Sequence, residues 1–462
     1  MDSGTRSGSG INKKLTIGAL ILIVLVSTGV HFYRISYPSA PVFDEAHFAT
    51  YAVDYTLHKA FFDIHPALGK LLYAGILWIS GAHPTQNQFL VEKYDPATKQ
   101  PDESTTGIPY GDFPYVLLRS FSALVGILLV IVFYFFLRTI GVPNLGALLG
   151  TFFLALDNAF IIQTRLILLD GFLWVLALSA LIFYFRKPQR PVLAGILWGL
   201  ALGVKLSAVV FIGPIIIYYL LKREKKALIT FISVGLVVLL LIIAINSLFS
   251  SLNDQIATLN SMFGFSIKLS TQATTTFATS LKNYFGITLV ETLQGFGNYI
   301  GGGGVQNTFT SPWYLWPLKQ IRMPYFIGSP SSALYPKDII LDGNPIVWYP
   351  STLAIIFGLV LCYRYTKDYL RGAEYKKGFL ILLSGYVLSM LPFILIVHRD
   401  TFLYHYLPSL IFGIGLLAWF IAHGLKLDNF DTLTKKQAFV LIGICAVIFI
   451  GFLSAAPGTY GL

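Results

Sequence analysis

Apolar runs long enough to cross a lipid bilayer recur along this chain, and they constrain its fold more than any other feature. The longest, Phe113–Leu137, contains a single charged residue, Arg119. Because a helix of roughly 20 apolar residues spans the hydrocarbon core, we predict about eleven transmembrane helices. The runs are Leu15–Phe32, Phe113–Leu137, Asn144–Ile162, Leu166–Phe185, Val192–Val204, Ser207–Leu221, Ala227–Leu248, Ile346–Tyr363, Phe379–Val397, Phe402–His423 and Phe439–Ser454.

The composition favours an all-α polytopic membrane protein. The 462 residues are 55% hydrophobic and 12% charged, whereas soluble domains are about 25% charged. No small-residue cleavage site follows Leu15–Phe32, so we read this run as an uncleaved helix and not as a signal peptide. Val192–Val204 and Ser207–Leu221 are short, and they are either one bent pair or two tilted helices.

The net charge of +11 does not indicate nucleic-acid binding, because the basic residues form short clusters between the apolar runs. Such clusters mark the cytoplasmic loops of membrane proteins. They are Lys13 and Lys14; Arg186, Lys187 and Arg190; Lys222, Arg223, Lys225 and Lys226; Arg364, Lys367, Arg371, Lys376 and Lys377; and Lys435 and Lys436.

A cytoplasmic N-terminus places every basic cluster on the cytoplasmic side. It also places two long segments, Arg34–Asp112 and Phe249–Pro345, on the outer side together with the C-terminus. In the first segment, the amphipathic stretch Glu45–Phe61 is expected to lie flat at the interface. The second contains the flexible run Gly301–Gly304 and an aromatic cluster. That cluster (Trp313, Tyr314 and Trp316) either binds acceptor or sugar, or belongs to a membrane-interface belt.

Several other sites are not indicated. The sequence has no internal repeat and no glycine-rich nucleotide motif. Its two cysteines, Cys362 and Cys445, lie inside apolar runs and lack metal-ligand spacing.

Acidic residues near the first helix are the first candidates for chemistry. Asp44 and Glu45 are adjacent carboxylates at a membrane surface, where one can accept a proton from an attacking hydroxyl. The alternatives are a solvated pair in a loop or a pair at the N-terminus of a helix, where acidic residues are favoured. Asp63 and His65 either form a polar wall of the same site or belong to a turn before a helix that begins near Pro66.

Basic residues also gather at the predicted outer ends of the helices. Arginine and lysine there suit a lipid phosphate, although a single cation at a helix end more often extends to the headgroups. Convergence of several cations on the side of Asp44 favours a phosphate site. The residues of this group are Arg119, Arg165, Lys205 and Arg399, with Asp170, Tyr404 and His405 beside them.

Two runs, Phe43–Phe48 and Phe62–Leu72, closely resemble the first outer loop of the protein O-mannosyltransferases, glycosyltransferase family 39. The resemblance extends from about Leu15 to Ala422, and its last block, Arg399–Pro408, is also specific. Weaker blocks lie between them: Leu118–Leu124, Arg165–Asp170, Gly203–Ser207, Ser311–Leu318 and Gly343–Pro345.

The resemblance implies one GT-C glycosyltransferase domain over residues 1–462. Such enzymes transfer mannose from a polyprenyl- or dolichyl-phosphate carrier to Ser or Thr hydroxyls of translocated proteins, with inversion. Asp44 would be the general base or the group that orients the acceptor hydroxyl, Glu45 would help hold the acceptor, and Arg119 and Lys205 would bind the phosphate. His405 and Arg399 would lie near the same pocket, with Asp63, His65, Arg165, Asp170 and Tyr404 in support.

The chain departs from eukaryotic members, which carry a MIR domain in the long outer loop. Residues 249–345 are too few for one, so we expect a prokaryotic plasma-membrane protein with its active site on the outer face. No cofactor beyond the lipid-linked sugar is expected. No metal is required, although the carboxylate pair could hold one. Translocation machinery is a possible partner, and nucleic acid is not.

Two other functions remain open. A related GT-C transferase that acts on a glycolipid, or uses another lipid-linked sugar, would need the same residues. A transporter or lipid flippase is more distant, because transporters place ionisable residues near the midplane and show two matching halves.

Overall fold

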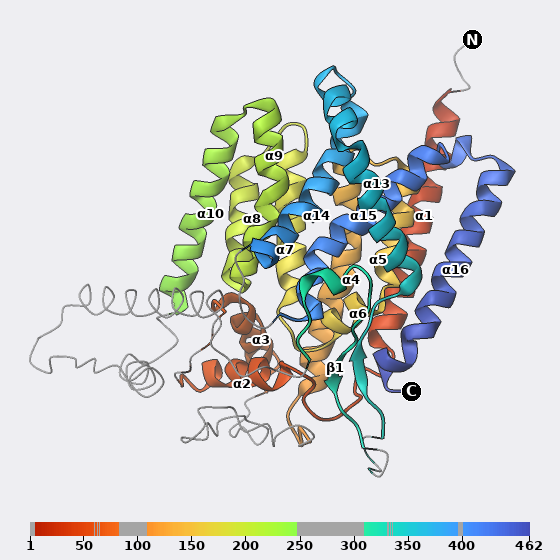
Figure 1. Cartoon of the computed structure of the whole chain (residues 1–462). Coiled ribbons are helices and arrows are strands. Elements are labelled where there is room, and N and C mark those ends of the chain that lie inside the picture. Colours follow the sequence, from red (N-terminus) through yellow and green to blue (C-terminus); the bar gives the residue numbers. More distant parts are fainter. Residues whose placement is uncertain are drawn as a thin grey trace, which may run out of the picture.

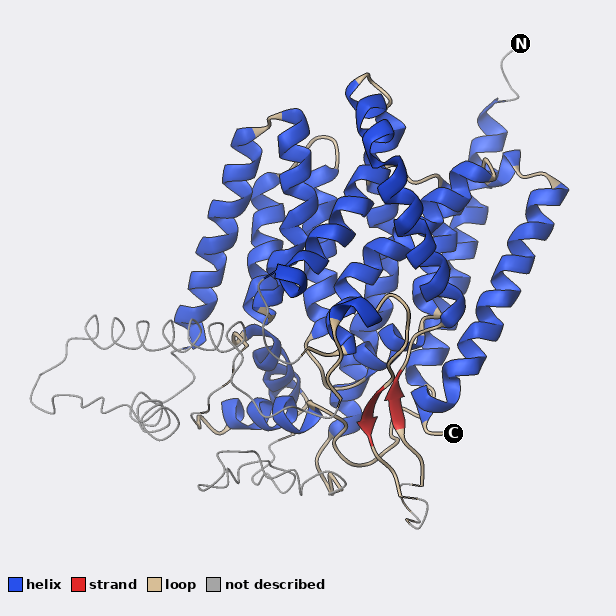
Figure 2. Ribbon diagram, viewed as in Figure 1, coloured by secondary structure: helices blue, strands red, loops and turns tan. Residues whose placement is uncertain are grey.

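The protein is a bundle of helices with one small two-stranded sheet at one end (Figures 1 and 2). The computed structural model describes residues 5–59, 61, 63, 65–82, 109–246, 309–329, 332, 334, 336–395 and 401–462. Most of the predicted second outer segment, including Gly301–Gly304, lies outside these residues, so the absence of a MIR domain stays a prediction.

Seven helices in the described part are long and apolar enough to cross a membrane. Three shorter apolar helices, α7 (Asp170–Phe185), α8 (Pro191–Val204) and α9 (Gly213–Lys222), pack among them. A multi-pass membrane protein is therefore confirmed, while the number eleven stays a prediction. The seven long helices include α1 (Thr5–Phe32), α4 (Tyr115–Thr139), α10 (Lys225–Asn246), α13 (Pro345–Leu370), α14 (Lys377–Leu395), α15 (Leu407–Gly424) and α16 (Lys435–Tyr460).

The two short runs that the sequence left ambiguous form separate helices. Helix α8 ends at Val204, and the 3-10 helix η2 (Leu206–Ile212) leads into α9. Helix α8 packs closely on α10, where a Cβ on Gly199 would come within 2.5 Å of the Gly235 carbonyl oxygen. Side chains larger than hydrogen at this crossing would force the two helices apart.

One predicted span is broken. We expected Asn144–Ile162 to be a single helix, but α5 (Asn144–Ala155) and α6 (Asn158–Arg165) meet at an angle of 63°. The break lies at Asp157, whose side chain accepts hydrogen bonds from the Ala159 and Phe160 amides. This cap supplies partners for the first amides of α6, which an apolar environment would otherwise leave unpaired.

The first outer segment forms two short helices at the end of the bundle that carries the sheet (Figure 1). Helix α2 (Glu45–Thr56) lies across that end, and α3 (Leu68–Ile79) packs against it. Most of α2 is buried in protein, and its position at the membrane interface stays a prediction. The helix ends at Thr56, before the predicted limit at Phe61.

The second outer segment contributes the strands β1 (Met323–Phe326) and β2 (Ile339–Leu341), which pair antiparallel. Before them, the 3-10 helix η3 (Trp313–Leu315) leads to Trp316, which is fully buried and donates a 2.9 Å hydrogen bond to the Ser311 hydroxyl. Trp316 is therefore a core residue, whereas Tyr314 is exposed. The aromatic cluster is thus divided between the core and the surface.

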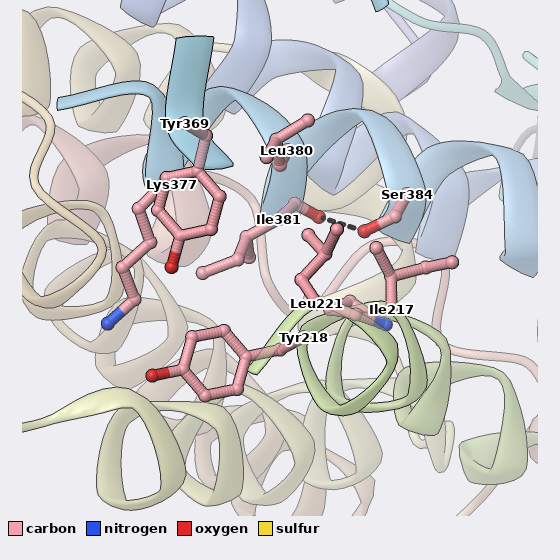
Figure 3. A pocket seen from close by; sticks show the side chains of 9 residues that line it. Ile217, Tyr218, Leu221, Tyr369, Lys377, Leu380, Ile381 and Ser384 are labelled. Atoms are coloured by element: carbon pink, nitrogen blue, oxygen red, sulfur yellow. Dashed lines mark hydrogen bonds between the residues drawn. The ribbon is translucent and has the colours of Figure 1, made fainter. Parts of the chain in front are cut away.

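The opposite end of the bundle carries the predicted basic loops and the start of α1, while α16 ends beside the sheet (Figure 1). A small cavity near the basic end lies between α9 and α14 (Figure 3). Its walls are mainly apolar, with Tyr218, Tyr369 and Lys377 at one side. None of the residues predicted to act in catalysis lines this cavity.

Candidate active site

Asp44 lies in the short connection between α1 and α2, at the end of the bundle that carries the sheet. It directly precedes α2, yet its side chain accepts no cap hydrogen bond. The carboxylate is half-buried, and no hydrogen bond or ion pair joins it to any residue of the described chain. The pair thus stands at a helix N-terminus, as the alternative expected, with Glu45 in the first turn, but the Asp44 side chain bonds none of the first amides as a capping aspartate would.

The electrostatic environment of Asp44 groups it with the other predicted residues. Burial raises the pKa of the Asp44 carboxyl above its usual value, and the nearby Asp170 and Asp63 add to the rise. The positive charges of His47 and Lys205 oppose it. A carboxylate with a raised pKa and no bound partner is a stronger proton acceptor than an ordinary aspartate.

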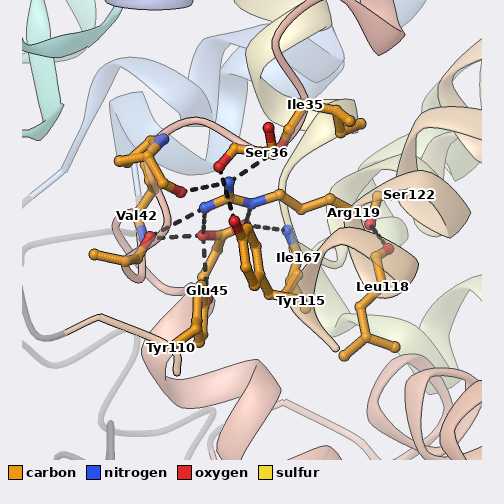
Figure 4. Close-up of polar contacts among 12 residues, drawn as sticks. Ile35, Ser36, Val42, Glu45, Tyr110, Tyr115, Leu118, Arg119, Ser122 and Ile167 are labelled. Atoms are coloured by element: carbon orange, nitrogen blue, oxygen red, sulfur yellow. Dashed lines mark hydrogen bonds and ion pairs between the residues drawn. The ribbon is translucent and has the colours of Figure 1, made fainter. Parts of the chain in front are cut away.

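Glu45 has the opposite environment, although it is the next residue. Its side chain is fully buried and accepts five hydrogen bonds (Figure 4). Two come from Arg119, at 2.8 and 2.6 Å. The others come from the amides of Val42 and Ile167, each at 2.9 Å, and from the Tyr110 hydroxyl at 3.2 Å. Such a saturated carboxylate has no lone pair left for an acceptor substrate.

Arg119 is equally saturated. Its guanidinium has five N–H donors; two bond Glu45, and the remaining three bond backbone carbonyls of the connection after α1 (Figure 4). Those carbonyls belong to Ile35, Pro38 and Ala40, at 3.2, 2.8 and 3.1 Å. In this geometry Arg119 has no donor free for a phosphate, so the arrangement favours a structural role over the expected phosphate contact.

Lys205 keeps a free donor beside Asp170 within the described residues. It lies at the end of α8, is 8% exposed, and bonds both carboxylate oxygens of Asp170 at 3.1 Å. A lysine ammonium has three N–H donors, so one remains after these two bonds. Its Nζ also lies 5.5 Å from the ring centre of Tyr404.

Asp63 and His65 lie beside this group and are held by a lysine that the sequence analysis did not single out. Lys70, on α3, forms an ion pair with Asp63 and donates to the His65 carbonyl. Burial alone would raise the pKa of Asp63, but Lys70 and His65 bring it below its usual value. Burial lowers the pKa of His65 to about 3, so its ring is neutral at physiological pH.

The remaining predicted residues fall into three groups. Tyr404 and His405 lie in the 3-10 helix η5 (Leu403–Tyr406) near the site, and the His405 ring packs on Trp316. Arg165 faces away, since it donates to the Tyr33 carbonyl at 2.6 Å and lies over the Tyr460 ring. Arg399 lies outside the described residues.

Two contacts near Asp44 had no signal in the sequence. Gln163 donates to Asp170 at 2.8 Å and accepts from the Tyr325 hydroxyl at 2.6 Å. Gln163 begins a short polar stretch, Gln163–Arg165, between two predicted spans, and Tyr325 lies in a segment without a recognised motif. Lys70, in contrast, lies within the matched block Phe62–Leu72 and could have been found.

No group of three or more His, Cys, Asp or Glu side chains that could hold a metal ion occurs within the described ranges. The charges at the site that the structure does show are those of Asp44, Asp63, Lys70, Asp170 and Lys205.

Solved structures with a similar fold are membrane glycosyltransferases. One chain of the Pmt1-Pmt2 protein O-mannosyltransferase complex of S. cerevisiae, solved with the sugar donor bound, matches at a TM-score of 0.73 and 16% identity. The match covers 96% of this chain and 90% of the other. An oligosaccharyltransferase of Archaeoglobus fulgidus matches at 0.57 with 13% identity, over 97% and 55% of the two chains. The chain therefore has the GT-C fold of membrane glycosyltransferases.

Two family models identify the group within that class. Residues 21–222 match the dolichyl-phosphate-mannose-protein mannosyltransferase model, and residues 298–462 match the C-terminal four-helix region of protein O-mannosyltransferases. The chain belongs to the protein O-mannosyltransferase family.

Curated relatives agree with this assignment. Dolichyl-phosphate-mannose–protein mannosyltransferase 1 of Saccharomyces cerevisiae is 34% identical over 177 residues, 38% of this chain and 20% of the relative. The enzyme of the same name from Candida albicans is 34% identical over 212 residues, 43% and 22% of the two chains. The matched part is thus about a fifth of each relative's length.

Proposed function

We propose that this protein transfers mannose from a lipid-phosphate carrier to Ser or Thr hydroxyls of proteins, with inversion at the sugar carbon. The observation that carries the proposal is Asp44, a carboxylate with a raised pKa and no bound partner, grouped electrostatically with Lys205 in a chain of this family. The names of the relatives support the donor and the protein acceptor.

In the proposed reaction, the acceptor hydroxyl oxygen bonds to the anomeric carbon of mannose while the bond from that carbon to the phosphate oxygen breaks. The hydroxyl proton passes to Asp44, and the lipid phosphate leaves with one more negative charge. Lys205 stabilises that charge through its remaining donor. No proton has to reach the leaving group, because the phosphate departs as a stable anion.

Glu45 and Arg119 act in this proposal as positioning residues. Their ion pair joins the start of α2 to α4, and the Ile35, Pro38 and Ala40 carbonyls bind the same guanidinium. The connection that bears Asp44 is therefore fixed on both sides. Neutral His65, together with Tyr404 and His405, completes the wall of the site, and Arg399 is expected near the same pocket.

The proposed setting is a prokaryotic plasma membrane with the N-terminus in the cytoplasm and the site on the outer face. A polyprenyl phosphate would then carry the mannose, and the acceptor would reach the site after translocation. The basic loops at the end opposite Asp44 support this orientation. The charge requirement is met by lysine, so the mechanism needs no metal.

The test is transfer of radiolabelled mannose from polyprenyl-phosphate-mannose to a Ser/Thr-rich peptide, with a glycolipid acceptor in parallel. Asp44→Asn should lower the turnover by about 100- to 10,000-fold, the usual contribution of a general base. The matched control is Asp112→Asn, which removes an exposed carboxylate on the same side and should retain activity.

If only the glycolipid is labelled, the acceptor is a glycolipid and the protein is the related GT-C transferase instead. An Asp44→Asn variant that folds and transfers mannose at the wild-type rate would exclude Asp44 as the base. Thermal unfolding of each variant in detergent separates loss of chemistry from loss of fold.

A further inference from the structure

Strand β1 contributes a tyrosine, Tyr325, that reaches both halves of the site. Tyr325 is 5% exposed and lies in the second outer segment, far in sequence from Asp44 and from Lys205. It makes three contacts there: one through its backbone carbonyl, one through its ring and one through its hydroxyl. Each contact fixes a different part of the site.

The carbonyl and the ring hold Phe43, the residue before Asp44. The Phe43 amide donates to the Tyr325 carbonyl at 2.9 Å, and the two rings stack with centres 4.3 Å apart. Phe43 has a φ of 54°, a left-handed conformation that bulky residues seldom adopt and that persists only when its surroundings enforce it. Tyr325 is therefore part of what sets the direction of the Asp44 backbone.

The hydroxyl of Tyr325 is linked to Lys205 by a series of hydrogen bonds through Gln163 and Asp170. Asp170 can only accept, so the Gln163 amide nitrogen must face it, and the Gln163 oxygen must face Tyr325. The hydroxyl thus fixes which way the amide points. The amide in turn orients the carboxylate that holds Lys205. Burial keeps the pKa of Tyr325 well above its usual value, so the hydroxyl remains a donor.

We propose that Tyr325 is a positioning residue that holds the base Asp44 and the phosphate-binding Lys205 in one geometry. This inference rests on the function proposed above. It assigns a role in alignment to the sheet of the second outer segment. The role has two separable parts. The hydroxyl orients the groups that hold Lys205, and the ring positions the backbone that bears Asp44.

Tyr325→Phe removes only the hydroxyl. It should raise the KM for polyprenyl-phosphate-mannose by about 10-fold, since a lost buried hydrogen bond is worth about 1–1.5 kcal/mol, and leave kcat within about twofold. Tyr325→Leu also removes the stacked ring, and it should lower kcat by about 100-fold as Asp44 loses its alignment.

Gln163→Met should reproduce the KM effect of Tyr325→Phe. The double variant should raise KM no further, because both changes break the same series of hydrogen bonds. The matched control is Tyr134→Phe. Its hydroxyl also donates to a buried side-chain amide oxygen, that of Asn144 at 2.8 Å, near the far end of α4. This control should leave KM and kcat at wild-type values.

Hydrogen exchange gives a readout that does not depend on mannose transfer. Peptides covering residues 41–48 should exchange faster in Tyr325→Leu than in wild type, and at the wild-type rate in Tyr134→Phe. If wild type transfers mannose but the Tyr325 variants have wild-type KM and kcat, the positioning role is overturned and the proposed function stands. If wild type transfers no mannose, the function fails, and unchanged exchange in Tyr325→Leu would overturn the positioning role as well.

Discussion

Asp44 and Glu45 show how different two adjacent acidic residues can be. Successive residues at a helix start point about 100° apart, so Glu45 faces α4 and Arg119 while Asp44 faces the site. One carboxylate is saturated by five hydrogen bonds, and the other makes none with the described chain. The same motif thus supplies a structural anchor and a carboxylate that makes no hydrogen bond within the described chain.

His47 offers a pH test of Asp44 as the base. Activity should fall as the pH drops through the raised pKa of Asp44, because only the carboxylate form accepts a proton. The positive charge of His47 lowers that pKa, so His47→Gln should move the acidic limb of kcat/KM to higher pH. An unchanged or lowered limb in His47→Gln would contradict this electrostatic link.

Replacement of Arg119 should mainly lower stability, whereas replacement of Lys205 should mainly weaken binding of the lipid phosphate. Arg119→Gln leaves Glu45 buried without its charge partner, which costs about 3–5 kcal/mol, so thermal unfolding in detergent without donor should shift clearly downward. Arg138→Gln, at the exposed end of the same helix, is the control and should unfold like wild type.

Lys205→Gln should instead weaken binding of polyprenyl phosphate, measured by titration of the purified protein. Asp170 keeps the bond from Gln163 but loses its charge partner, so some loss of stability is expected as well, and binding is compared on protein that thermal unfolding shows to be folded. A stable Arg119→Gln protein that has lost lipid-phosphate binding would reverse our assignment and restore the direct phosphate contact expected from sequence.

At the scale of elements, the break between α5 and α6 decides which side chains reach the site. Asp157 receives the Trp348 ring N–H at 2.7 Å and the Asn344 amide at 3.1 Å, in addition to the two amides of α6. Asn344 also donates to the carbonyls of Leu156 and Ile448. These hydrogen bonds hold the start of α13 against the break. The break also orients α6 so that Gln163 can bond Asp170.

Asp157→Ala should destabilise the protein through unpaired buried donors, each of which costs about 1–3 kcal/mol. Asp157→Asn, which keeps one oxygen acceptor, should be affected less. Thermal unfolding followed by tryptophan fluorescence measures both. Equal stability of the two variants would show that the cap contributes little to the break.

At the scale of the whole molecule, the two ends of the bundle should lie on opposite sides of the membrane. Cysteines introduced at Arg371, in the connection between α13 and α14, and at Asp112, before α4, are both exposed. In a background lacking Cys362 and Cys445, a membrane-impermeant maleimide should label Asp112→Cys in intact cells and Arg371→Cys only after lysis. The reverse pattern would invert the proposed topology.

The sequence predicted the helices well because a bilayer allows few alternatives. Ten of the eleven predicted runs each overlap one helical segment, for example α4 at Tyr115–Thr139, although the limits differ by up to ten residues, as at the start of α1. The exception is the break at Asp157, which needs Trp348 and Asn344, nearly 190 residues away. Hydropathy along the chain carries no information about such distant partners.

The site was predicted less completely than the fold. Motif blocks led to Asp44, Asp63, His65, Asp170 and Lys205, which the structure brings together electrostatically. They could not show that every N–H donor of Arg119 is hydrogen-bonded within the protein, because three of these bonds go to backbone carbonyls in another segment. Gln163 and Tyr325 were missed because a glutamine between two spans, or a tyrosine in a short strand, has no distinctive pattern.

The network around Glu45 also has a consequence for the order in which the protein is made. Glu45 leaves the ribosome first, Arg119 follows 74 residues later and Ile167 follows 122 residues later. Until both have arrived, the glutamate has to stay in water, and the connection that bears Asp44 has no fixed shape. A chain whose α4 is inserted in the wrong orientation cannot close this network, so the shape of the connection that bears Asp44 depends on correct insertion of the first half of the protein.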